Sequence, residues 1–99
     1  MFSQVHYLLR AKKDGKYLVA NQQNEKGNKQ SYLLVFREDF DALSYLNTHA
    51  PEYKNEFSIE SASSQQLKLI LTRWGFIGLA IVEDSLTPKV QFLTQNSLF

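Results

Sequence analysis

One stretch, Ser31-Tyr32-Leu33-Leu34-Val35-Phe36, decides the expected fold, because every residue in it after the serine is apolar. A short, near-continuous apolar run is typical of a strand that is buried on both faces, and such strands lie in the middle of a sheet. We therefore expect residues 31–36 to form the central strand, and we assign the other elements outward from it.

Two strands joined by a tight turn are expected before this stretch. Residues 5–10 are rich in β-forming side chains, and residues 17–20 form the expected return strand. Asp14-Gly15 between them is a strong hairpin signal, because glycine tolerates the positive φ that a tight turn needs. Residues 21–30 contain no apolar side chain, so we predict a mobile loop there.

A first helix is expected after the central strand. Acidic residues from Glu38 to Asp41 favour the positive end of a helix dipole, so the helix begins near Asp39. Proline disfavours α geometry in the residue before it, so the helix ends just before Pro51. Apolar residues recur at helical spacing and predict one core-facing stripe: Phe40, Leu43, Leu46 and Ala50.

The second helix has the clearest local signature. Ser63 and Gln66 have the spacing of a capping box, and Gly75 stands where helices commonly end in a left-handed residue. Its apolar residues recur at helical spacing: Leu67, Ile70, Leu71 and Trp74. We expect Trp74 to pack in the core with this face, the alternative being an anchor at an interface.

Three more strands complete the expected fold: residues 57–60, 76–83 and 89–94. Residues 84–88 are the expected turn between the last two, and residues 95–99 the expected loose tail. The order β-β-β-α-β-α-β-β predicts a single α+β domain over residues 1–99. We expect a single mixed or mainly antiparallel sheet with two helices, both on one face. Right-handed crossovers would make the strands of its β-α-β-α-β middle parallel.

The composition points to a reducing, cytoplasmic setting. The chain has 99 residues and no cysteine, which excludes disulfides, thiolate metal sites and cysteine nucleophiles. The segment Met1–His6 lacks the pattern of a signal peptide, so none is expected. The apolar run Ile77–Val82 is too short to span a bilayer, so no membrane role is expected.

The basic residues suggest one candidate binding surface. Net charge is only +1, but bases concentrate before residue 38. Six of them fall on the expected hairpin and the loop after it, and they are the candidate nucleic-acid contacts: Arg10, Lys12, Lys13, Lys16, Lys26 and Lys29. The alternative is that these side chains are simply solvated and protect a sheet edge from pairing.

No catalytic, metal-binding or cofactor-binding residue is predicted. The only histidines, His6 and His49, form no recognised ligand pair, and the four glycines form no phosphate-binding loop. The acids at residues 38–41 are explained by the start of a helix. A small enzyme or ligand site assembled from scattered residues remains an alternative, and we expect it near Glu38–Asp41.

A non-enzymatic protein-binding or regulatory module is therefore the leading interpretation, with nucleic-acid binding as the alternative. The interpretation includes self-association as a homodimer. Self-association would use Ile77–Val82, if that strand is an exposed edge, or the terminal Leu98-Phe99.

Several segments share a plan with a known family: Val35-Phe36, Glu38–Ala42, Tyr45-Leu46, Phe57–Glu60 and Gly75 with the apolar strand after it. Over residues 32–82 the chain resembles a small family of uncharacterised cyanobacterial and chloroplast proteins. It departs from that family at the N-terminal hairpin and the last strand. The resemblance implies this element order and an intracellular, photosynthetic-type origin, and it implies no catalytic residues.

Overall fold

The computed structural model describes residues 5–84 and 89–95. Within them one mixed sheet contains β1 (His6–Ala11), β2 (Val19–Gln23), β3 (Lys29–Phe36), β4 (Phe57–Ala62), β5 (Gly78–Asp84) and β6 (Lys89–Thr94). The helices are α1 (Asp39–His49), the 3-10 helix η1 (Pro51–Glu56) and α2 (Ser64–Trp74). The α+β class and the predicted element order are confirmed. Residues 85–88 of the expected turn and residues 96–99 of the expected tail lie outside the described residues.

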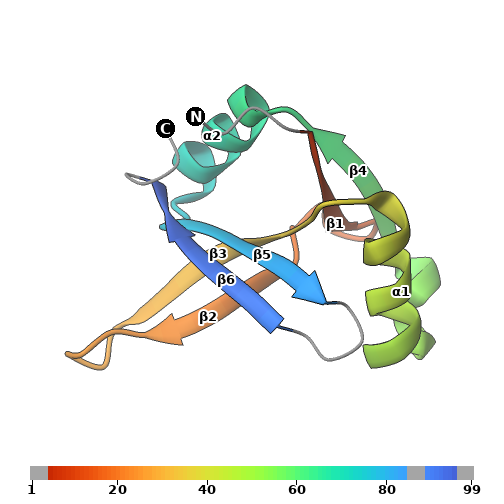
Figure 1. The fold of residues 1–99 in the computed structure, drawn as a ribbon, viewed down its shortest axis with the longest axis horizontal. Coiled ribbons are helices and arrows are strands. Elements are labelled where there is room, and N and C mark those ends of the chain that lie inside the picture. The colour runs from red at the N-terminus through yellow and green to blue at the C-terminus, as the bar shows by residue number, and fades with distance from the viewer. Residues whose placement is uncertain (1–4, 85–88, 96–99) are drawn as a thin grey trace.

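The strand order is β4-β1-β3-β5-β6, with β2 also paired to β3 (Figure 1). Strand β3 is central, as predicted, and Leu33, Val35 and Phe36 have no exposed surface. Strands β3 and β5 pair in parallel, and every other pair is antiparallel. Strand β4 runs in the same direction as β3 and β5, but β1 lies between β4 and β3, so the expected parallel pairing holds for β3 and β5 alone.

The two helices cover opposite faces of the sheet, so the expectation that they share one face is wrong. Alternate residues of β3 pack into two separate cores. Leu67 and Leu71 of α2 belong to one core, and Ala42 and Leu46 of α1 belong to the other. The chain crosses from β3 to β4 in one direction and returns from β4 to β5 in the other. Both crossovers are expected to be right-handed, and two right-handed crossovers that run in opposite directions across a sheet place their helices on opposite faces.

Residues 21–30, predicted to be a loop, form most of a polar β-hairpin arm that projects from the sheet (Figure 1). Strand β2 pairs with β3 from Val19 opposite Leu33 to Gln23 opposite Lys29. The Asn24 side chain shapes the turn by accepting from the N–H groups of Lys26 and Asn28, at 3.0 and 2.9 Å. The arm has water on both faces, so it needs no apolar residues, and hydropathy alone cannot detect it.

The first hairpin is also only partly as predicted. The turn after β1 is present, since Gly15 N–H donates to Ala11 and Ala11 N–H to Lys16. The return strand touches β1 at a single bridge, between Arg10 and Tyr17, and then continues as β2 along β3. Strand β1 pairs instead with β4 over its full length.

Helix α1 has the predicted bounds but buries a different face. Leu46 is buried as expected, whereas Phe40 is 64% and Leu43 47% exposed. The contact with the sheet is made by Ala42 and Leu46, and Tyr45 packs on Phe36 with ring centroids 5.4 Å apart. The small Ala42 is fully buried, which turns Phe40 and Leu43 toward solvent.

Strand β5 lies inside the sheet, between β3 and β6. The segment Ile77–Val82 is therefore not an exposed edge for self-association, contrary to the expectation. Gly78 lies where β6 approaches closely, because a Cβ there would overlap the main chain of Leu93 and Thr94. Gln95, the first residue of the expected loose tail, is held by a 2.9 Å hydrogen bond from its N–H to the carbonyl of Ile77.

Candidate protein-binding groove

A groove of about 960 Å³ runs between α2 and the turn that follows β1. We call it the α2 groove, and it is lined by Arg10, Tyr17, Leu69, Ile70, Thr72, Arg73 and Trp74. A smaller hollow of about 250 Å³ continues it toward β4, sharing Tyr17, Leu69 and Ile70. The α2 groove joins residues of the C-terminal half of α2 to residues beside the turn after β1, more than 50 positions earlier in the sequence.

Trp74 forms the aromatic end of the α2 groove. The expectation that it packs in the core is wrong, because the side chain is 38% exposed while Leu67 and Leu71 on the same stripe are buried. Its ring meets Tyr17 edge to face, with centroids 5.2 Å apart at 77°, and stacks near Phe76 at 6.1 Å and 24°. Trp74 is the last residue of α2, so it reaches the margin of the core rather than its centre.

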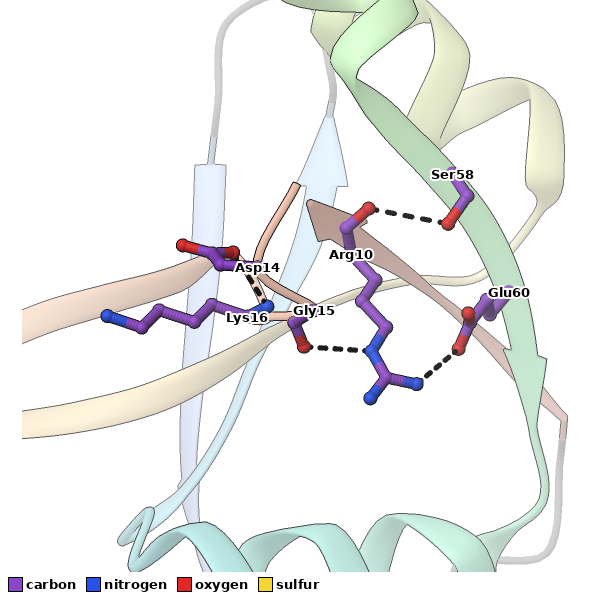
Figure 2. A network of polar contacts seen from close by, with 6 residues as sticks. All are labelled: Arg10, Asp14, Gly15, Lys16, Ser58 and Glu60. Carbon is purple, nitrogen blue, oxygen red and sulfur yellow. Dashed lines mark hydrogen bonds and ion pairs between the residues drawn. The ribbon is translucent and has the colours of Figure 1, made fainter. Parts of the chain in front are cut away.

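Arg10 is held against the same wall of the groove (Figure 2). Its Nε donates to the carbonyl of Gly15 at 2.8 Å, and its Nη1 lies 3.8 Å from Glu60 Oε1. Its guanidinium lies over the Tyr17 ring, 4.9 Å from the centroid. Three contacts therefore fix the orientation of this cation, and stacking on Tyr17 is a favourable arrangement for arginine.

The outer rim of the α2 groove comes from the exposed side of the helix. Leu69 is 69% exposed, the largest exposure among the large apolar side chains that the structure describes. Arg73 lies one turn further along α2, and no residue in the described ranges forms an ion pair or hydrogen bond with its side chain. The groove thus presents a tryptophan, a tyrosine, a leucine and an unpaired arginine to solvent.

The six candidate nucleic-acid contacts do not form one surface. Lys12, Lys13 and Lys16 lie at or beside the turn after β1, and Arg10 is engaged by the groove wall. Figure 2 shows the Lys16 side chain pointing away from that of Arg10. Lys26 and Lys29 lie at the far end of the polar arm, about 20 Å along an extended strand from the first turn.

The acidic start of α1 lies beside a second groove, of about 380 Å³. We call it the α1 groove, and it is lined by Tyr7, Asp39, Phe40, Leu43, Ile59 and Ser61. It coincides with the place expected for a scattered ligand site, but apolar side chains supply most of its lining. Sequence reasoning assigned Phe40 and Leu43 to the core and so missed this surface. The sequence did contain a signal for this surface. Helical spacing places Phe40 and Leu43 on a different side of the helix from Ala42 and Leu46, so both pairs could not face the core.

Neither histidine lines the α1 groove or the α2 groove. His6 is buried in β1, with 1% of its surface exposed. His49 ends α1, where a basic group suits the helix dipole, and its ring lies 4.8 Å from that of Tyr45. Across residues 5–84 and 89–95, no three histidine or acidic side chains are grouped so that they could hold a metal ion. None of the helices there is long and apolar enough to cross a membrane.

Comparison of the chain with protein-family models, with curated proteins and with solved structures finds no match. The resemblance to the cyanobacterial and chloroplast family stays a prediction.

Proposed function

We propose that this chain is a non-enzymatic protein-binding module that docks a peptide segment of its partner in the α2 groove. The proposal rests on one observation: the exposed Trp74 packs edge to face on Tyr17, and the Arg10 guanidinium lies over the ring of the same tyrosine. Tryptophan, tyrosine and arginine are the residues most enriched among those that dominate binding energy at protein interfaces.

The chemistry of the groove defines the segment that it would accept. Leu69 and Trp74 provide exposed apolar surface, which suits aliphatic or aromatic side chains. Arg73 has no partner among the described residues, and Arg10 is shared with Glu60 at 3.8 Å. A peptide that carries a carboxylate next to its apolar residues would pair with Arg73 through the bidentate contact that arginine favours.

The rigidity of the groove supports binding rather than chemistry. Arg10 and Tyr17 are fixed by neighbours, so few side chains must be ordered when a ligand docks, and this lowers the entropic cost of association. The polar side-chain groups of the groove are the two guanidiniums, the Thr72 and Tyr17 hydroxyls and the Trp74 indole N–H, and Thr72 donates to the carbonyl of Lys68 at 3.0 Å. None of the seven lining residues carries a carboxylate or an imidazole, the usual bases that activate a nucleophile.

The test uses Trp74 as its own reporter, because it is the single tryptophan of the chain. Peptides selected from a displayed random library on the full chain are titrated while Trp74 emission is followed. We expect selected peptides to shift that emission. We expect Leu69→Ala to weaken binding by about tenfold or more, as loss of an interface anchor does.

Leu43→Ala is the matched control, since Leu43 is also an exposed helical leucine but lies on the opposite face. It should leave peptide affinity unchanged. Equal losses for both variants, or no selected peptide that alters Trp74 emission, would refute the proposal. A parallel titration with single-stranded DNA tests the alternative. Binding that falls steeply with salt and requires Lys12, Lys13 and Lys16 would favour nucleic acid instead.

A further inference from the structure

Strand β4 has an open edge. It pairs with β1 and with no other strand among the described residues, and it ends the strand order of the sheet (Figure 1). An open edge presents unpaired main-chain N–H and C=O groups that form a template for another strand. Proteins usually protect such edges with charged side chains, yet the middle of this one is Ile59, which is 36% exposed.

The register with β1 identifies the outward-facing groups. Lys12 N–H donates to the Glu56 carbonyl at 2.9 Å, which marks that pair as hydrogen-bonded. Hydrogen-bonded and non-bonded pairs alternate along an antiparallel ladder. Glu60, opposite Leu8, therefore bonds to β1. The residues that direct their main-chain groups outward are Phe57, Ile59 and Ser61.

The side chains beside this edge differ between the two faces of the sheet. Ile59 lies opposite Leu9, on the α1 face, and borders the α1 groove with Phe40 and Leu43. Ser58 and Glu60 lie on the other face, toward Arg10 (Figure 2). An apolar patch thus adjoins the open edge on one face, and a neutral and an acidic side chain adjoin it on the other.

We propose that β4 pairs antiparallel with β4 of a second copy of this chain, about a two-fold axis through Ile59. Ile59 is the middle of the three outward-facing residues, so it would face Ile59 of the second copy. Phe57 would face Ser61 of the second copy, and Ser61 its Phe57. Each of these pairs exchanges two main-chain hydrogen bonds, about six in all, and the two sheets become continuous.

The charges select this register. With Ile59 on the axis, Glu60 lies opposite Ser58 of the second copy. A shift of two residues in either direction places Glu60 opposite Glu60 or opposite Glu56 of the second copy. Like charges directly opposite each other destabilise a strand pair. The centred register avoids both contacts, and each Glu60 keeps its own Arg10 at 3.8 Å.

The same axis joins the apolar patches. The two Ile59 side chains meet on the α1 face, with Phe40 and Leu43 of each copy flanking them. Phe40 is the second most exposed large apolar side chain described. A two-fold axis would bury Phe40 of each copy against the same surface of the other copy. This explains why an apolar surface on α1 adjoins the open edge, and it favours a second copy over an unrelated strand.

Sedimentation velocity on the full chain over a wide concentration range tests the proposal. We expect a dimer that dissociates on dilution. Ile59→Lys should weaken it by at least about tenfold, because two ammonium groups would face each other. Ser61→Pro should weaken it similarly by removing an outward N–H, whereas the ladder to β1 does not use that group. Gln91→Lys, at an exposed position of β6 on the other edge of the sheet, is the matched control and should leave dimerisation unchanged.

A cross-link tests the register independently of these variants. The chain has no cysteine, so Ile59→Cys provides the only thiol. Cα atoms of a hydrogen-bonded antiparallel pair are about 5.5 Å apart, within disulfide range. We expect Ile59→Cys to form a covalent dimer faster than Ser58→Cys, which reports a shifted register. A monomer at every concentration, a dimer insensitive to Ile59→Lys and Ser61→Pro, or faster cross-linking at Ser58→Cys would overturn the proposal.

Discussion

Tyr17 and Trp74 meet edge to face, with their ring centroids 5.2 Å apart, and this contact ties the turn after β1 to the end of α2. Both side chains are partly exposed, and they come from segments far apart in the sequence. The pair therefore positions the α2 groove, and Arg10 reaches it by lying over the Tyr17 ring.

Removing the tyrosine should alter the tryptophan directly. Tyr17→Ala is expected to shift Trp74 emission to longer wavelength, because the indole loses its cover on one side. The unfolding free energy should fall by about 2 kcal/mol, from the lost aromatic pair and the apolar area around it. Fluorescence and urea denaturation measure both. Tyr53→Ala, at an exposed position in η1, is the control, and an unchanged emission maximum in Tyr17→Ala would contradict the prediction.

The N-terminus of α2 offers a clean measure of capping. Ser63 Oγ accepts from Gln66 N–H at 3.2 Å, and Gln66 Oε1 accepts from Ser63 N–H at 2.8 Å. Ser63→Ala should lower the unfolding free energy by about 1 kcal/mol, because one helix N–H loses its acceptor. Ser64→Ala, one position later, should change it by less than about 0.5 kcal/mol. Equal losses for the two variants in chemical denaturation would contradict a specific role of the Ser63 cap.

The close approach of β6 makes Gly78 intolerant of a side chain. A Cβ would overlap the carbonyl of Leu93 and crowd the Thr94 Cα, and main chain held in a sheet cannot move aside cheaply. Gly78→Ala is expected to cost about 3 kcal/mol or more. Gly27→Ala has open space around it and a positive φ of 82°, so only about 1 kcal/mol of backbone strain is expected. Thermal denaturation compares them, and a Gly78→Ala loss no larger than that of Gly27→Ala would disprove the close packing.

The polar arm should open without unfolding the domain. Asn24→Ala removes the acceptor for the N–H groups of Lys26 and Asn28. We expect faster hydrogen exchange at residues 21–30, while the buried residues 79–82 of β5 keep their protection, because the arm buries few apolar contacts. Exchange followed by mass spectrometry resolves the two regions. Faster exchange in β5 as well would mean that the arm and the sheet unfold together.

Local signals in the sequence predicted much of the fold. The start and end of α2, the bounds of α1, the central strand and β6 are all encoded by residues within a few positions of each feature. A capping box, a proline or an apolar run acts at short range, so it needs no knowledge of the rest of the chain. The α2 groove was not predicted, because Trp74 was assigned to the core. The α1 groove lies at the place expected for a scattered ligand site, but its apolar lining was not predicted, because Phe40 and Leu43 were assigned to the core.

The sequence by itself therefore determined both α-helices with their ends and the buried strands, but it did not reveal the polar arm of residues 21–30, whose strands are held by main-chain pairing. Only the tertiary structure decided which side chains remain exposed. The reversal of crossover direction places α1 and α2 on opposite faces, and the rotation of α1 about Ala42 leaves Phe40 and Leu43 in solvent. Exposure depends on strand order and helix rotation, and both are set by contacts between residues far apart in the chain.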